Sequence, residues 1–147
     1  MIAPRLAELA SAAYLANTPV LYRGAGAFQC WYSFVATKQY ETDPVGAERA
    51  LLRSPVPEDI CFGLTQFALA AASKENVTDA LRFVDAAQVT CDEKYGYRLG
   101  AVREVARAWT IKEGPKPAVR WARSRQTPSQ RWLALLGVAE ATGHRHP

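Results

Sequence analysis

Apolar residues recur along most of the chain at three- and four-residue spacing, which is the period of an amphipathic helix. The clearest example is segment 98–109, where Arg and Glu residues lie between the regularly spaced apolar residues. Gly114-Pro115 and Thr127-Pro128 interrupt this pattern, and a further helical segment follows each break. Another helix is expected over residues 4–16, before a break at Asn17-Thr18-Pro19. The pattern predicts an all-α chain of about seven helices.

Three of the predicted helix starts recur at similar intervals. Asp43-Pro44, Asn76-Val77 and Gly114-Pro115 are 33 and 38 residues apart, and each pair opens with a residue accepted at a helix N-cap. Aligning these starts brings equivalent apolar positions together: Trp31, Phe34 and Val35; Leu64, Phe67 and Ala68; Val102, Val105 and Ala106; and finally Leu135, Val138 and Ala139. The chain therefore contains an internal helical repeat.

The repeat predicts how the helices are organised. We expect hairpin copies at about 27–57, 58–92 and 93–126, a closing helix over 128–142 and a tail over 143–147, all in one domain spanning 1–147. A single hairpin cannot bury its apolar face, so stacked neighbours would cover it. A closed bundle would use the same helices, and the periodicity alone leaves both packings open.

The spacing within each copy resembles the tetratricopeptide repeat. In that family a large residue is followed three positions later by an apolar residue, then directly by a small one, and an aromatic residue comes three further on. Val102, Val105, Ala106 and Trp109 match all four classes. The ends of the copies depart from the family, because the terminal Pro is shifted or absent and one copy has 38 residues instead of 34. The pentatricopeptide class has nearly the same helix pair.

This resemblance implies a right-handed stack of antiparallel hairpins, an α-solenoid whose concave groove holds an extended peptide or a partner's helix. It therefore implies a non-catalytic protein-interaction scaffold. The groove-facing positions by this resemblance are Gln29, Tyr32, Gln39, Thr65, Arg103 and Arg107. Arg103 and Arg107 are four residues apart on one helix face, and arginine can bind a carboxylate through two hydrogen bonds. An acidic or C-terminal peptide is the partner that these two arginines suggest.

The charge distribution offers an alternative partner. Residues 1–94 carry 8 basic and 11 acidic side chains, whereas residues 95–147 carry 10 basic and 3 acidic ones, a net charge of +7. A basic half favours acidic partners of any kind. Nucleic acid is the runner-up, with phosphate contacts from Arg98, Arg103, Arg107, Arg120, Arg123, Arg125 and Arg131 and base stacking on Tyr95 and Tyr97.

The sequence shows no catalytic arrangement, and no cofactor or metal is expected. The two histidines, His144 and His146, both lie in the last four residues, where a metal site or nucleophile pair would lack supporting structure. Gly24-Ala-Gly26 lacks the spacing and the Lys of a phosphate-binding loop. The four tryptophans, Trp31, Trp109, Trp121 and Trp132, fall on apolar helical faces, so they are expected in the core.

The cysteines and the apolar runs bear on location. Cys30, Cys61 and Cys91 are odd in number and far apart, and Arg5 and Glu8 interrupt the N-terminal apolar run as no signal peptide would allow. These features predict free thiols in the cytoplasm. No run of 18 apolar residues occurs, so no membrane span is expected.

The closing helix is apolar on more than one side. Leu133 and Leu136 lie outside the stripe formed by Trp132, Leu135 and Val138. We therefore expect this helix to pack against a partner or a second copy of the chain.

Overall fold

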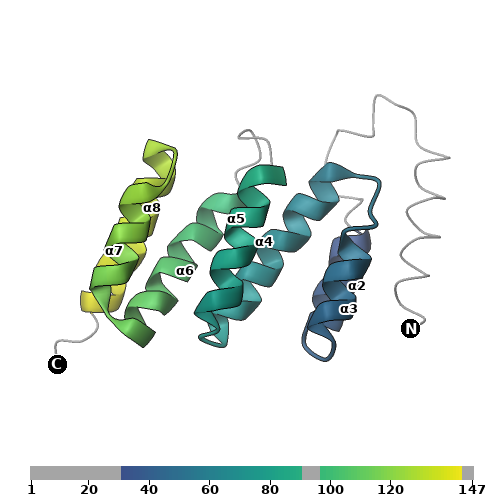
Figure 1. The fold of residues 1–147 in the computed structure, drawn as a ribbon, viewed down its shortest axis with the longest axis horizontal. Coiled ribbons are helices and arrows are strands. Elements are labelled where there is room, and N and C mark those ends of the chain that lie inside the picture. Colours follow the sequence, from purple (N-terminus) through teal and green to yellow (C-terminus); the bar gives the residue numbers. More distant parts are fainter. Residues whose placement is uncertain (1–30, 91–96, 144–147) are drawn as a thin grey trace. The chain divides into compact units, whose positions relative to one another are not determined.

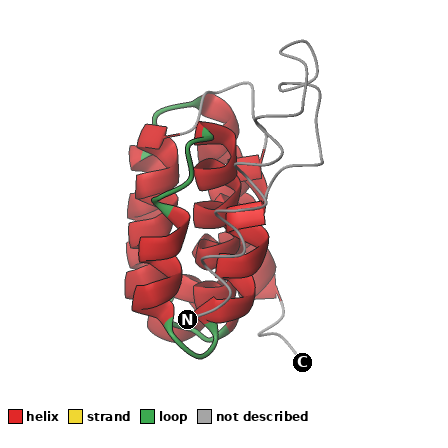
Figure 2. Ribbon diagram, turned by 90° about the vertical axis from the view of Figure 1, so that its right-hand side faces the viewer, coloured by secondary structure: helices red, strands yellow, loops and turns green. Residues whose placement is uncertain are grey.

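A computed structural model describes residues 31–90 and 97–143 of the chain. These residues form seven helices and no strand (Figure 2). The helices are α2 (Trp31–Tyr40), α3 (Pro44–Leu51), α4 (Pro57–Ser73), α5 (Val77–Thr90), α6 (Tyr97–Glu113), α7 (Pro115–Ser124) and α8 (Pro128–Gly143). The all-α prediction is confirmed for this part of the chain. The helix expected over 4–16 and the last four residues of the tail lie outside it.

The chain divides into two compact units, residues 1–64 and 65–147, with the boundary inside α4. The described part of the first unit holds α2, α3 and the start of α4. The second unit holds the rest of α4 and helices α5 to α8. The single domain expected over residues 1–147 stays a prediction.

Helix α3 begins at Pro44, where the sequence predicts it. The carboxylate of Asp43 accepts a hydrogen bond from the backbone N–H of Gly46 at 2.9 Å, so Asp43 is a true N-cap. This hydrogen bond lowers the pKa of Asp43 below its ordinary value, because it favours the charged carboxylate.

Helices α5 and α7 also begin at the predicted residues. The side chain of Asn76 accepts a hydrogen bond from the backbone N–H of Asp79 at 3.3 Å in the first turn of α5. Gly114 precedes α7 and has a φ of +90°, a backbone conformation that residues with a Cβ rarely adopt. Glycine, rather than a side-chain cap, therefore makes the short turn between α6 and α7.

The small residues of the repeat are buried, as the pattern requires. Ala47, Ala80 and Ala118, which lie at equivalent positions near the starts of α3, α5 and α7, are completely inaccessible to solvent. The first-helix positions Leu64, Phe67, Ala68, Val102, Val105 and Ala106 are buried as well. The repeat thus identifies core positions correctly in the second and third copies.

In the first unit, a close helix contact and a buried carboxylate hold α4 to its neighbours. A Cβ at Gly63 would lie 2.4 Å from a methyl carbon of Leu51, so α3 and α4 meet where a side chain would not fit. Asp59 is only 1% exposed. It accepts hydrogen bonds from the backbone N–H of Ser33, at 3.1 Å, and from the Ser54 hydroxyl, at 3.0 Å. The carboxylate therefore satisfies an amide in the first turn of α2.

In the second unit, α6 packs against α5, α7 and α8, and its contact with α8 is the most extensive (Figure 1). Gly137 of α8 lies against the backbone of α6, because a Cβ at this position would sit 2.2 Å from the carbonyl oxygen of Arg103. Phe67 of α4 and Phe83 of α5 pack edge to face, with ring centroids 5.3 Å apart.

The structure corrects the predicted orientation of α8. Its buried residues are Gln130, Ala134, Gly137, Val138 and Ala141. Trp132 is 64% exposed and Leu135 is 39% exposed, so of the predicted stripe only Val138 is buried. The expectation of a core position is therefore wrong for Trp132. The predicted stripe and the buried residues both have helical spacing. Only the buried set contains Gly137, which allows α8 to approach α6 closely.

The structure also corrects the prediction of free thiols. Cys61 is buried and disulfide-bonded. The other two cysteines, Cys30 and Cys91, lie outside the described residues. Because disulfides persist mainly in oxidising compartments, the cysteine-based argument for a reducing cytoplasm no longer holds.

The close contact of α6 and α8 predicts opposite effects for two glycine substitutions. Gly137→Ala forces the helices apart, and we expect it to lower the free energy of unfolding by about 1–3 kcal/mol. Gly100→Ala in α6 is the control, because no atom lies within 4 Å of its Cβ position. It should raise the free energy by about 0.5–1 kcal/mol through helix propensity. Urea denaturation measures both, and an equal effect of the two changes would contradict the packing of α8.

The disulfide of Cys61 predicts a thiol count. The chain has three cysteines, so denatured but unreduced protein should react with one equivalent of Ellman's reagent, and reduced protein with three. Three reactive thiols before reduction would contradict the disulfide.

Candidate partner-binding surface

Arg103, a predicted groove residue, is already engaged within the protein. Its guanidinium binds the carboxylate of Glu140 on α8 through two hydrogen bonds, with Nε 2.9 Å from Oε2 and Nη2 bound to Oε1. The Glu140 carboxylate raises the pKa of Arg103 above its ordinary value through these hydrogen bonds and its charge. Arg103 therefore fastens α6 to α8, and the two donors best placed for a partner's carboxylate are occupied.

Arg107, the second arginine of the predicted groove, also has a carboxylate partner. Its Nε lies 3.0 Å from Oε2 of Glu104, one turn earlier on α6, and both side chains are partly exposed. An exposed pair of this kind contributes little to stability and can exchange partners. Arg107 is thus the more available of the two arginines.

Two of the remaining predicted groove residues are engaged or buried within the described structure. Gln39, in the first unit, donates a hydrogen bond from Nε2 to Asp43 at 3.1 Å and so supports the cap of α3. Thr65 is buried, with 2% of its surface exposed, and offers no contact area to a partner. Gln29 lies outside the described residues, and for Tyr32 only its place in α2 is described.

Arg125, one of the arginines considered for nucleic-acid binding, is also used inside the protein. Its Nη1 donates to Asp85 at 2.8 Å and to Gln88 at 3.2 Å, both on α5. The guanidinium also lies 4.4 Å from the ring centroid of Trp121. Only 11% of the side chain is exposed, so Arg125 joins the end of α7 to α5 and is not available to phosphates.

A second group of cations has no acidic partner among the described residues. Lys116, Arg120 and Arg123 follow one another at helical spacing on α7, and Arg131 lies on α8. All four are exposed. Three of these cations therefore lie on α7, which packs against α8, and the fourth lies on α8 itself. We call them the basic row. For Arg98, only its place in α6 is described.

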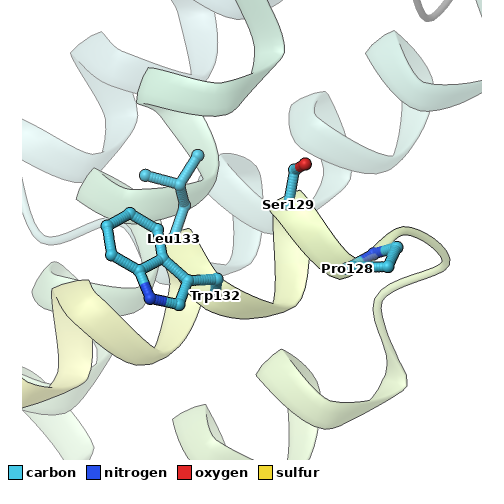
Figure 3. A pocket seen from close by; sticks show the side chains of 4 residues that line it. All are labelled: Pro128, Ser129, Trp132 and Leu133. Atoms are coloured by element: carbon cyan, nitrogen blue, oxygen red, sulfur yellow. The ribbon is translucent and has the colours of Figure 1, made fainter.

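The outer face of α8 is apolar. Pro128, Trp132, Leu135 and Ala139 are exposed and follow one another at four-, three- and four-residue spacing. Beside Trp132 there is an open hollow of about 460 Å³, lined by Pro128, Ser129, Trp132 and Leu133 (Figure 3). We call these residues together the α8 outer face. Contiguous exposed apolar residues of this kind occur at interaction sites.

No cluster of three or more His, Cys, Asp or Glu side chains occurs in the described residues that could hold a metal ion. None of the described helices is long and apolar enough to span a bilayer. His144 and His146 lie outside these residues. Comparison of the chain with protein-family models, with curated proteins and with solved structures finds no significant match.

The Arg103–Glu140 pair predicts energetic coupling between α6 and α8. Arg103→Gln and Glu140→Gln should each lower the free energy of unfolding, and the double variant should lose less than the sum of the two, because each single change leaves a charge unpaired. The matched control is the cycle Arg107→Gln with Glu104→Gln, a pair within one helix, which should show weaker coupling. Strictly additive effects in the Arg103 cycle would contradict the pair.

Proposed function

We propose that the chain is a non-catalytic scaffold of the tetratricopeptide-like class and that it binds another protein. The helix order supports an open stack within the second unit. In that unit α6 packs between α5 and the α7–α8 pair, and from α5 onward each helix contacts the next one along the chain. In a stack of this kind, a helix face that no neighbouring helix covers stays exposed.

The exposed face of α8 is the observation that carries the proposal. By the 33-residue shift, Leu135 and Ala139 correspond to Val102 and Ala106 of α6. Val102 and Ala106 are 1% and 0% exposed, whereas Leu135 is 39% exposed and Ala139 is exposed. The same helical face is thus covered in one copy and open in the next. Leaving Trp132 and Leu135 in water is unfavourable, and a bound protein would remove that cost.

The concave groove implied by the resemblance is a less favoured site. Arg103 is bound to Glu140, and Thr65 is buried. A peptide carboxylate would have to displace Glu140 before it could bind Arg103 through two hydrogen bonds. The α8 outer face needs no such exchange.

Nucleic acid is the second candidate, and the basic row favours it. Four exposed cations without acidic partners can each contact one phosphate. The dependence of log K on log salt would then have a slope of about −3 to −4. The apolar face formed by Trp132 and Leu135 carries no charged group that could bind a phosphate. For this reason we favour a protein partner.

Affinity capture from a source lysate tests the proposal. The wild-type chain, Trp132→Ala and the control Val89→Ala are each immobilised, and capture is carried out with and without nuclease at low and moderate salt. Val89 is 90% exposed on α5, so its change removes an exposed apolar group that is not part of the α8 outer face. We expect the same protein with wild type and Val89→Ala after nuclease, and little of it with Trp132→Ala.

Two results would count against the proposal, the first against the scaffold function and the second against its binding site. One is recovery of nucleic acid alone, lost as salt rises, which would assign the function to the basic row. The other is a protein retained equally by all three forms, which would remove the α8 outer face from the interface. Thermal unfolding of each variant verifies that its fold is intact.

A further inference from the structure

The partner of the α8 outer face can be described from the chemistry around it, and this description rests on the proposed function. The apolar positions run from Pro128 to Ala139 along one side of α8. At 1.5 Å per residue this is about 17 Å, or three helical turns. A straight apolar strip of this length fits the apolar stripe of one partner helix.

The hollow beside Trp132 adds a second requirement. Pro128 and Ser129 lie on the turn before Trp132 and Leu133, and the space among these four residues is open to solvent (Figure 3). Three of the four residues are apolar. An apolar side chain projecting from the partner helix would enter this hollow, and a polar one would lose its hydration there without a partner for its hydrogen bonds.

Among the described residues of α7 and α8, the charged side chains without a partner are all cations. Arg131 directly precedes Trp132 on α8, and the other members of the basic row lie on α7, which packs against α8. No acidic side chain of the described structure pairs with them. The acidic residue of α8, Glu140, is bound by Arg103. The edge of the α8 outer face is therefore positively charged, and it complements carboxylates.

This charge argues against a second copy of the chain as the occupant. A symmetric pair formed through α8 would bring two copies of the basic row to the same interface. Residues 95–147 carry a net charge of +7, so the two copies would repel each other. An amphipathic partner helix with acidic residues along its edge is complementary to both the apolar strip and the basic row.

We infer that the α8 outer face and the basic row together bind an amphipathic helix of another protein. The apolar stripe of this helix packs along Pro128, Trp132 and Leu135, one of its large side chains enters the hollow, and Asp or Glu residues along its edge pair with Arg131 and Arg123.

Designed peptides test this inference without knowledge of the natural partner. The probes are fluorescein-labelled helical peptides of about four turns. All carry an apolar stripe with Leu, Ile, Phe or Trp as the anchor, and each is made in a Glu-edged and a Lys-edged version. Fluorescence anisotropy with the full chain should show that Glu-edged peptides bind at least about tenfold tighter than their Lys-edged counterparts.

Variants of the chain separate specific binding from a loss of folding. Trp132→Ala should weaken the Glu-edged peptides by about tenfold or more, while the control Val89→Ala should not change their affinity. The double variant Arg123→Glu, Arg131→Glu should reverse the preference, so that Lys-edged peptides bind more tightly. A misfolded variant cannot produce such a reversal, because it would lose both classes of peptide.

Three results would overturn the inference. The first is that no Glu-edged peptide binds, or that both versions bind equally. The second is a dimer of the wild-type chain in sedimentation equilibrium that Trp132→Ala dissociates, which would make a second copy the occupant. The third is salt-dependent binding of a single-stranded oligonucleotide that the acidic peptides fail to displace. If lysate capture still yields a protein in any of these cases, the proposed scaffold function is retained. Only the inference that the partner is an acidic amphipathic helix is then wrong.

Discussion

The backbone contact between α6 and α8 at Gly137 determines the surface that the second unit offers. With the Gly137 Cβ position only 2.2 Å from the carbonyl oxygen of Arg103, α8 can face α6 only through its side of small residues. Ala134, Gly137 and Ala141 therefore turn inward, and the bulky Trp132 and Leu135 turn outward. The Arg103–Glu140 pair then fixes the same register by charge. The exposed apolar face of α8 is thus a consequence of close packing.

Local signals in the sequence were enough to predict where three of the helices begin. Asp43, Asn76 and Gly114 precede helices at the predicted residues, because capping and positive φ are local requirements that the sequence states directly. The burial of Ala80 and Ala118 could be predicted from the repeat, because equivalent positions of a repeat have equivalent packing environments. The hairpin stack itself is a matter of long-range packing, and it stays a proposal.

The candidate site was less predictable, because it depends on contacts between distant residues. Arg103 and Glu140 are 37 positions apart, so the sequence offered no reason to pair them. In α8 two stripes have the helical period, and hydrophobicity favours the wrong one. Gly137 was the available signal, since a glycine within an apolar helix marks a close backbone approach. The disulfide of Cys61 likewise could not be read from the widely spaced cysteines.

The orientation of Trp132 is the claim on which the rest of this account depends, and fluorine NMR measures it directly. The chain labelled with 5-fluorotryptophan should give one resonance for each of its four tryptophans, and Trp132→Phe assigns the relevant one. Because its side chain is exposed, the Trp132 resonance should shift more between H₂O and D₂O than the resonances of Trp109 and Trp121. The rings of these two tryptophans pack edge to face, with centroids 6.2 Å apart. A Trp132 resonance that is less sensitive to solvent than both would place this side chain in the core and contradict the account.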